Sequence, residues 1–203
     1  MDRLQKTSEN LSKHGFLVQV LESAAQAKEE ALKLIGEKSV GFGGSMTVNQ
    51  MGIYDVLLEK GNSVYWHWKA PSKDALPAIF KGAREADVYI TSTNDIMENG
   101  SLLNIDGNGN RVMGMFNGPK TVIVIAGENK LAGDYEDALA RIKREACPKN
   151  GQRLNLKTPC ALTGKCTDCN SPDRMCKVTA LLERPSGMAP NVHILLVKEA
   201  LGY

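Results

Sequence analysis

Two short apolar runs, separated by a polar segment rich in glycine, constrain the fold of this chain most strongly. The runs cover residues 87–91 and 121–126, and five glycines divide the segment between them. Apolar runs of this length, bounded by turn signals, are typical of strands that are buried on both faces, as in a parallel sheet. The polar segment is then either a surface loop with a hairpin at 106–109 or a ligand site at the carboxyl ends of the strands.

A strand–helix–strand pattern near the N-terminus predicts how the sheet is connected. We expect a strand over 16–21, a helix over 24–35 and a strand over 39–42, and Ser23 with Gln26 matches a capping box at the helix start. This spacing implies parallel strands joined by a right-handed crossover. The other expected elements are strands over 62–68 and 191–198 and helices over 3–13, 46–59, 71–86 and 134–147, with Pro148 ending the last helix.

These elements predict an α/β fold of three layers with a mainly parallel sheet and a small cysteine-rich lobe towards the C-terminus. The expected division places residues 1–148 and 186–203 in the α/β domain and residues 149–185 in the lobe. With 203 residues, of which 42% are hydrophobic, the chain is long enough for one core of ordinary size.

The distribution of charge is more informative than the net charge. The total of +2 gives no reason to expect a nucleic acid partner. Residues 141–184 contain ten Lys or Arg and four Asp or Glu, which is a local charge of +6 and leaves −4 for the rest of the chain. A basic region of this kind favours an anionic ligand, although a solvated basic face is the commoner explanation. With no signal segment or run of transmembrane length, we expect a cytoplasmic protein without membrane insertion.

A glycine pair after the strand at 39–42 is a second candidate for anion binding. Gly43 and Gly44 allow the backbone to approach a ligand closely, and the hydroxyls of Ser45 and Thr47 lie at the start of the next expected helix. A Gly-Gly pair before a helix is also an ordinary tight turn. His67 is the only histidine in a plausible site position, and a lone histidine at a strand end is more often structural.

Four cysteines within seventeen residues predict a metal site. Cys160, Cys166, Cys169 and Cys176 follow the spacing C-x5-C-x2-C-x6-C, and a pair separated by two residues can share one metal centre. Four thiolates suit a [4Fe–4S] cluster or a structural zinc ion, and nearby basic residues would offset the charge of a cluster. The alternative is a set of buried free thiols. Cys147 either replaces one of the four ligands or is a spare thiol.

Two stretches in the centre of the chain resemble a known family. The runs ENGSLLNIDGNGNRV (98–112) and GPKTVIVIAGENKL (118–131) resemble the LUD-domain (lactate utilisation) family, which belongs to the superfamily of ribose-5-phosphate isomerase, glucosamine-6-phosphate deaminase and coenzyme A transferases. The resemblance extends from about Leu11 to the C-terminus and includes a similar GGS-x-T turn. It implies the three-layer fold, a role in lactate or organic-acid oxidation, and partner subunits that carry iron–sulfur clusters.

The same resemblance implies a role for one acidic residue. In the coenzyme A transferases a Glu-Asn-Gly turn presents a glutamate nucleophile, which corresponds here to Glu98. The residues expected to bind a small anionic ligand are Gly43, Gly44, Ser45, Thr47, Thr93, Asn94, Asn99, Gly100, Asn104, Asp106, Asn110 and Lys130. The asparagines alternatively pin turns through their side-chain oxygens.

Three functions remain open on these grounds. The first is a LUD-type protein of organic-acid oxidation that binds an anion and a metal cluster. The second is a self-contained acyl-coenzyme A transferase or sugar-phosphate isomerase that uses Glu98, and the third is a regulatory subunit with structural zinc. A homo-oligomer is compatible with each of them.

Overall fold

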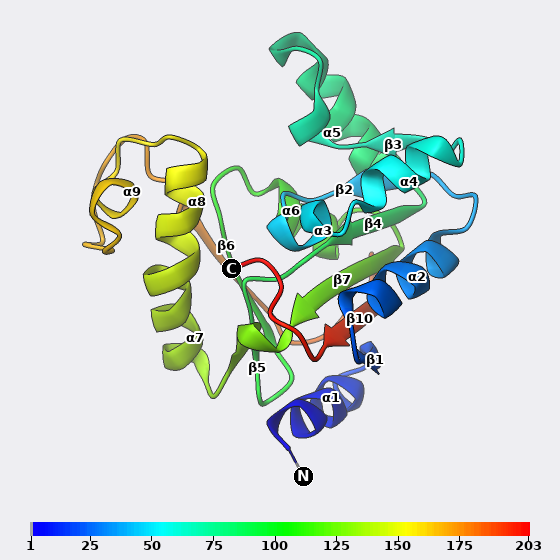
Figure 1. Ribbon diagram of the computed structural model, residues 1–203, viewed down its shortest axis with the longest axis horizontal. Coiled ribbons are helices and arrows are strands. Elements are labelled where there is room, and N and C mark those ends of the chain that lie inside the picture. Colours follow the sequence, from blue (N-terminus) through cyan, green and yellow to red (C-terminus); the bar gives the residue numbers. More distant parts are fainter. Residues whose placement is uncertain (1) are drawn as a thin grey trace.

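Six parallel strands form the central sheet of the protein (Figure 1). We use a computed structural model and describe residues 2–203. The strands at 40–42, 88–91 and 121–127 are almost entirely buried, as their apolar sequences predicted. In order across the sheet, the strands are β1 (Leu17–Leu21), β10 (Asn191–Val197), β7 (Thr121–Gly127), β4 (Val88–Thr91), β2 (Val40–Phe42) and β3 (Val64–Tyr65).

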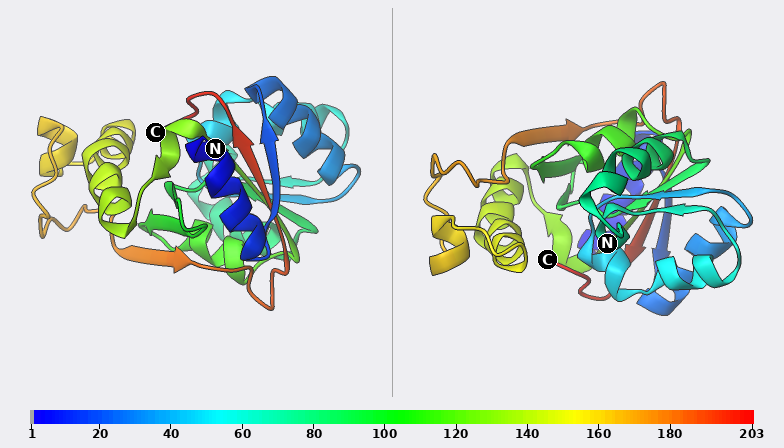
Figure 2. Two further views of the ribbon diagram at one scale, coloured as in Figure 1. Left: turned by 90° about the horizontal axis from the view of Figure 1, so that it is seen from below. Right: turned by 90° about the horizontal axis from the view of Figure 1, so that it is seen from above.

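Helices cover both faces of this sheet, so the predicted three-layer α/β class is confirmed (Figure 2). Because side chains alternate along a strand, Ile123 and Ile125 of β7 face one helical layer while Val122 and Val124 face the other. The first layer comprises α2 (Ala24–Ile35), α3 (Met46–Gln50) and α4 (Ile53–Glu59). The second comprises α1 (Arg3–Lys13), α5 (Leu76–Glu85) and α6 (Asn110–Phe116).

A second sheet of four strands stands beside the first. Its order is β8 (Leu131–Ala132), β5 (Asp95–Met97), β6 (Leu102–Asp106) and β9 (Val178–Leu182). The pair β5–β6 is an antiparallel hairpin, and β9 runs antiparallel to β6. A helical segment packs over this sheet around Leu103, Ile105 and Ile142; it consists of α7 (Tyr135–Arg141), a π-helical turn (Ile142–Ala146) and α8 (Cys147–Arg153).

Three predicted boundaries were wrong. The helix expected to end before Pro148 continues to Arg153, because the π-helical turn ahead of Pro148 makes room for a ring that an α-helical turn would exclude. The helix over 46–59 is broken at Gly52, whose φ of 61° is left-handed. The strand over 62–68 is short, because the chain turns into a 3₁₀ helix, η1 (His67–Lys69).

The hairpin expected at 106–109 is absent from the described chain. Residue 109 instead precedes α6, and the hairpin turn lies at 98–101, between β5 and β6. The expected cysteine-rich lobe is also tied to the α/β domain at both ends. Its expected start lies inside α8, and its last strand, β9, pairs with β6 from Asp106↔Val178 to Leu102↔Leu182.

Candidate anion cavity and cysteine site

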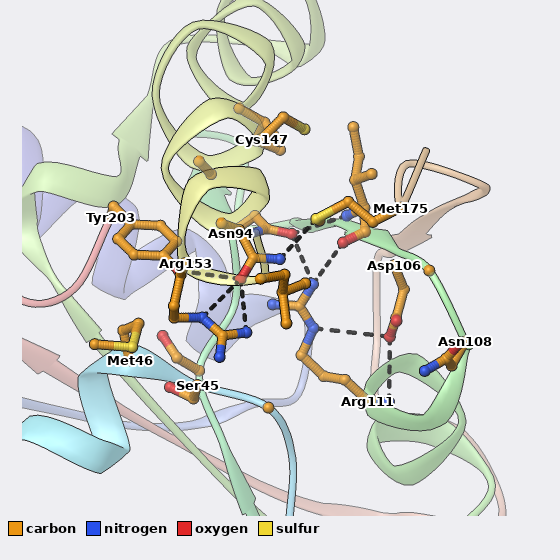
Figure 3. Close-up of a pocket in the computed structure, with 18 of the residues that line it drawn as sticks. Ser45, Met46, Asn94, Asp106, Asn108, Arg111, Cys147, Arg153, Met175 and Tyr203 are labelled. Atoms are coloured by element: carbon orange, nitrogen blue, oxygen red, sulfur yellow. Dashed lines mark hydrogen bonds and ion pairs between the residues drawn. The ribbon is translucent and has the colours of Figure 1, made fainter. Parts of the chain in front are cut away.

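A cavity of about 410 Å³ lies at the carboxyl ends of the central strands (Figure 3). Gly44 and Ser45 follow β2, Thr93 and Asn94 follow β4, and Lys130 follows β7, in the 3₁₀ helix η3 (Glu128–Lys130). The opposite wall comes from α8 and from the segment that leads into α6. Parallel strands bring their carboxyl ends to one edge of a sheet, which is why residues far apart in sequence meet here.

Lys130 is a cation in the lining of this cavity, and only 3% of the residue is exposed. Its Nζ donates to Thr47 Oγ1 (3.0 Å), Ser92 Oγ (2.9 Å) and the Thr93 carbonyl oxygen (3.3 Å), so within residues 2–203 its partners are neutral oxygen atoms. Burial is the main influence that lowers the pKa of Lys130 to about 7, and the positive charges of Arg111 and Arg141 contribute to the shift. Lys130 is therefore a buried amine that can gain or lose its charge near neutral pH.

Arg111 and Asp106 form the side of the cavity near α6. Arg111 Nη2 donates to Asn94 Oδ1 (2.8 Å) and to the Ile105 carbonyl oxygen (2.6 Å), and Arg111 Nε lies 3.9 Å from Asp106 Oδ2. The Asp106 carboxylate also accepts from three backbone N–H groups at the start of α6. Asp106 and Asn94 thus spend most of their hydrogen-bonding capacity on the protein itself, as the alternative interpretation of the polar residues predicted.

Trp68, Arg153 and Tyr203 add aromatic and basic groups to the cavity lining. The guanidinium of Arg153 lies 4.2 Å from the centre of the Trp68 ring and donates to Asn150 Oδ1 at 3.1 and 2.9 Å. Tyr203 donates to the same oxygen atom at 3.1 Å. Burial lowers the pKa of His67, which also lines the cavity. Most charged groups of the lining are cations, which favours an anionic occupant.

The last residues of the chain close the cavity near Lys130. The Thr47 hydroxyl donates to the Leu201 carbonyl oxygen (3.2 Å), and the Leu201 N–H donates to Asn129 Oδ1 (3.0 Å). Gly202 has φ of 63°, and a Cβ atom at this position would lie 2.6 Å from Thr47 Oγ1. Glycine is therefore required for the chain to pass so close to the Lys130 contacts.

The structure brings together seven of the twelve predicted ligand residues. Those that line the cavity are Gly44, Ser45, Thr93, Asn94, Asp106, Asn110 and Lys130. Those that do not are Gly43, Thr47, Asn99, Gly100 and Asn104. Gly43 serves packing, because a Cβ atom there would lie 2.4 Å from Thr91 Oγ1. Thr47 does not line the cavity, but its hydroxyl accepts a hydrogen bond from Lys130, which does.

Glu98 lies outside the cavity, in the turn between β5 and β6. Its carboxylate accepts from Lys6 Nζ (3.0 Å) and Arg3 Nε (2.8 Å), both on α1. The hydrogen bond from Lys6 is the main influence that lowers the pKa of Glu98, and the hydrogen bond from Arg3 adds to it. Asn99 and Gly100 complete the turn, with Asn99 Oδ1 accepting from the Ser101 N–H (3.0 Å). Glu98 and the cavity residues are thus not assembled into one site.

The cysteines line a second, smaller cavity. All five free cysteines line it, together with Thr158, Thr167, Arg174 and Met175. The Cys166 sulfur accepts from the Asp168 N–H at 3.5 Å, and Arg174 donates to the carbonyl oxygens of Cys169 (2.6 Å) and Cys176 (3.1 Å). Within residues 2–203, no three Cys, His, Asp or Glu side chains are arranged to hold a single metal ion.

Comparison with known proteins assigns the family. The model of the LUD domain matches residues 4–197, nearly the whole chain. The chain belongs to the LUD-domain family. Membership supports a protein of the lactate-utilisation type. No curated protein matches the sequence of this LUD domain. Within residues 2–203, its helices are too short or too polar to cross a membrane.

Two solved structures are similar to this LUD domain. A DUF162 family protein from Deinococcus radiodurans superposes with a TM-score of 0.56 at 11% identity, over 97% of this chain and 99% of that protein. Ribose 5-phosphate isomerase A from Neisseria gonorrhoeae superposes with a TM-score of 0.34 at 15% identity, over 60% of this chain and 63% of the isomerase. At this identity, the first match shows that the two proteins share a fold.

Several residues of the LUD-domain cavity were not predicted. Arg111 lies directly after a predicted ligand residue, and its position at the start of a helix after a glycine turn was the available signal. Arg153, Tyr203 and Trp68 carry no local signal, because they reach the cavity only when α8, the C-terminal segment and η1 pack against the sheet edge.

Proposed function

We propose that this protein binds a small organic anion in the Lys130 cavity, holds a metal centre through its cysteines, and acts in the oxidation of lactate or a related organic acid. The observation that carries the proposal is the buried amine of Lys130 at the carboxyl ends of the sheet, surrounded in the described chain by neutral oxygen atoms. A buried ammonium group is costly unless an opposite charge accompanies it. A bound carboxylate supplies that charge.

The surroundings of Lys130 support an organic acid as the ligand. Arg111, Arg153 and Arg174 add positive charge to the cavity, while Met46 and Leu154 add apolar surface. The volume of about 410 Å³ lies in the range of about 300–1,000 Å³ that is usual for pockets of drug-sized ligands. A lactate-sized acid fills only part of that space, so we propose a 2-hydroxy acid or a larger relative, with its carboxylate towards Lys130.

The cysteines support a metal centre in the adjoining cavity. We propose Cys160, Cys166, Cys169 and Cys176 as ligands of a [4Fe–4S] cluster, with a zinc ion as the alternative. The fit rests on the five cysteines that line one cavity and on the N–H to sulfur hydrogen bond at Cys166. When bound, a cluster supplies one-electron transfer, whereas zinc supplies structure only.

Anion binding is tested by titration calorimetry with L-lactate, pyruvate and a longer 2-hydroxy acid. We expect binding by the wild-type protein and its loss in Lys130→Met. The matched control is Lys149→Met. It removes an exposed lysine of α8 whose ammonium group pairs with Glu145. Unchanged binding in Lys130→Met, or no binding of any of these acids, would overturn the anion part of the proposal.

The metal centre is tested by measuring iron, zinc and acid-labile sulfide after strictly anaerobic purification. Iron and sulfide in matching amounts, lost in Cys166→Ser, would support a cluster and a redox function. Zinc without sulfide would instead support a structural site and a regulatory function. Protein that binds neither metal would overturn this part of the proposal.

A further inference from the structure

The anion cavity and the cysteine cavity share a wall. Cys147, Arg174 and Met175 line both of them, and Figure 3 shows Cys147 and Met175 among the side chains around the larger cavity. Cys147 lies at the start of α8 and is only 3% exposed. A single layer of side chains therefore separates the proposed ligand from the proposed metal ligands.

Arg174 is the residue in this wall that can contact both occupants. A guanidinium group has five N–H donors. Three are used in the protein: they donate to the Cys169 carbonyl oxygen (2.6 Å), the Cys176 carbonyl oxygen (3.1 Å) and the exposed carboxylate of Asp168 (3.4 Å). Among residues 2–203 the remaining two have no protein acceptor, and Arg174 lines the anion cavity.

The segment around Arg174 is attached firmly to the anion cavity. The Lys177 N–H donates to the Asp106 carbonyl oxygen (3.0 Å), and Asn150 Nδ2 donates to Met175 Sδ (2.7 Å). A Cβ atom at Gly107 would lie 2.9 Å from the Met175 carbonyl oxygen, so this close approach requires glycine. A shift of the loop that carries Cys169 and Cys176 would therefore displace the backbone at Asp106.

We propose that Arg174 couples the two cavities, so that an anion in the larger one strengthens metal retention by the cysteines. This inference rests on the proposed function, because it needs both an anion and a metal. An anion bound to the two remaining N–H donors fixes the guanidinium, which in turn fixes the carbonyl groups of Cys169 and Cys176 and orders the ligand loop. By thermodynamic linkage, the metal strengthens anion binding by the same factor.

The test measures how much metal the metal-loaded protein has transferred to a competing chelator at equilibrium, with and without saturating sulfate or L-lactate. Coupling between sites is commonly about 5- to 150-fold, so we expect the anion to lower the equilibrium transfer of metal by at least about fivefold. Arg174→Lys keeps a positive charge but cannot hold both carbonyl groups in the same geometry, so it should lose this effect. Arg144→Gln is the matched control, because Arg144 is exposed and, in the part of the chain that the structure describes, its side chain bonds to Glu145 alone.

A second measurement uses the wild-type protein alone and does not depend on the folding of a variant. Calorimetry should show tighter sulfate or lactate binding by metal-loaded protein than by metal-free protein, by the factor found in the transfer experiment. If both ligands bind but neither affects the other, the inference is wrong and the proposed function stands. If the anion or the metal does not bind at all, the proposed function fails and the inference fails with it.

Discussion

Anion binding in the Lys130 cavity should weaken steeply as pH rises above neutrality. The pKa of Lys130 is lowered to about 7, mainly by burial. The amine therefore carries its charge in about half of the molecules at pH 7 and in roughly one in a hundred at pH 9. If the ligand binds only the charged form, its affinity should fall by about 50-fold between these two pH values. Calorimetry with sulfate at pH 6, 7, 8 and 9 measures this change directly.

The same pKa predicts how stability depends on pH. The folded-state pKa of Lys130 is about 7, whereas an unfolded lysine titrates near 10.4. Between these values the unfolded chain binds more protons than the folded protein, so the contribution of Lys130 to the free energy of unfolding rises with pH. Below pH 7 both states are charged, and the cost of burying the charge is present in full. Urea denaturation at pH 6.5 and 9 measures the rise.

Lys130→Met is the decisive variant for both effects. It should bind sulfate weakly at every pH, and its free energy of unfolding should lack the part of the pH dependence that Lys130 contributes. Lys149→Met, on the outer surface of α8, should behave as wild type. An affinity that is constant from pH 6 to 9 in the wild-type protein would refute the argument, as would a pH dependence that survives in Lys130→Met.

Three further substitutions test other parts of the structure. Arg141→Met breaks the buried pair with Asp95, where Arg141 Nε lies 2.8 Å from the fully buried carboxylate, and should cost about 3–5 kcal/mol of unfolding free energy in urea denaturation. Glu98→Gln should leave anion affinity by calorimetry at the wild-type value, because Glu98 contacts α1 and not the cavity; a large loss of affinity would show that the assignment of the site is incomplete. Gly202→Ala should lower the melting temperature and weaken anion binding by several-fold, because its Cβ would displace Thr47; wild-type values would show that the C-terminal segment is not part of the site.

Local patterns in the sequence predicted the elements whose stability is local or whose burial is complete. The strands at 87–91 and 121–126 were predicted because both faces of a central parallel strand are apolar, and the helix at 24–35 because its capping residues lie beside it. The continuation of α8 through Pro148 was not predictable in this way. It depends on a π-helical turn that a proline rule does not include.

In the candidate site too, local sequence patterns predicted some residues and not others. Residues that directly follow β2, β4 and β7 were predicted, because the carboxyl ends of parallel strands meet at one edge. Glu98 was placed there by resemblance, but its turn belongs to the β5–β6 hairpin and extends towards α1. Arg153 and Tyr203 enter only through tertiary packing. The cysteines line a common cavity, and the shared metal site stays a prediction.

The path of the C-terminal segment decides how the protein should be prepared for these measurements. Residues 200–203 run beside Lys130 and end with Tyr203 in the cavity lining (Figure 3). An affinity tag fused after Tyr203 would begin beside the cavity lining, where its own side chains could compete with a ligand. A tag before α1 begins beside the 98–101 turn instead, outside the cavity lining. We therefore expect anion affinities measured on protein tagged at the N-terminus to be free of competition from the tag.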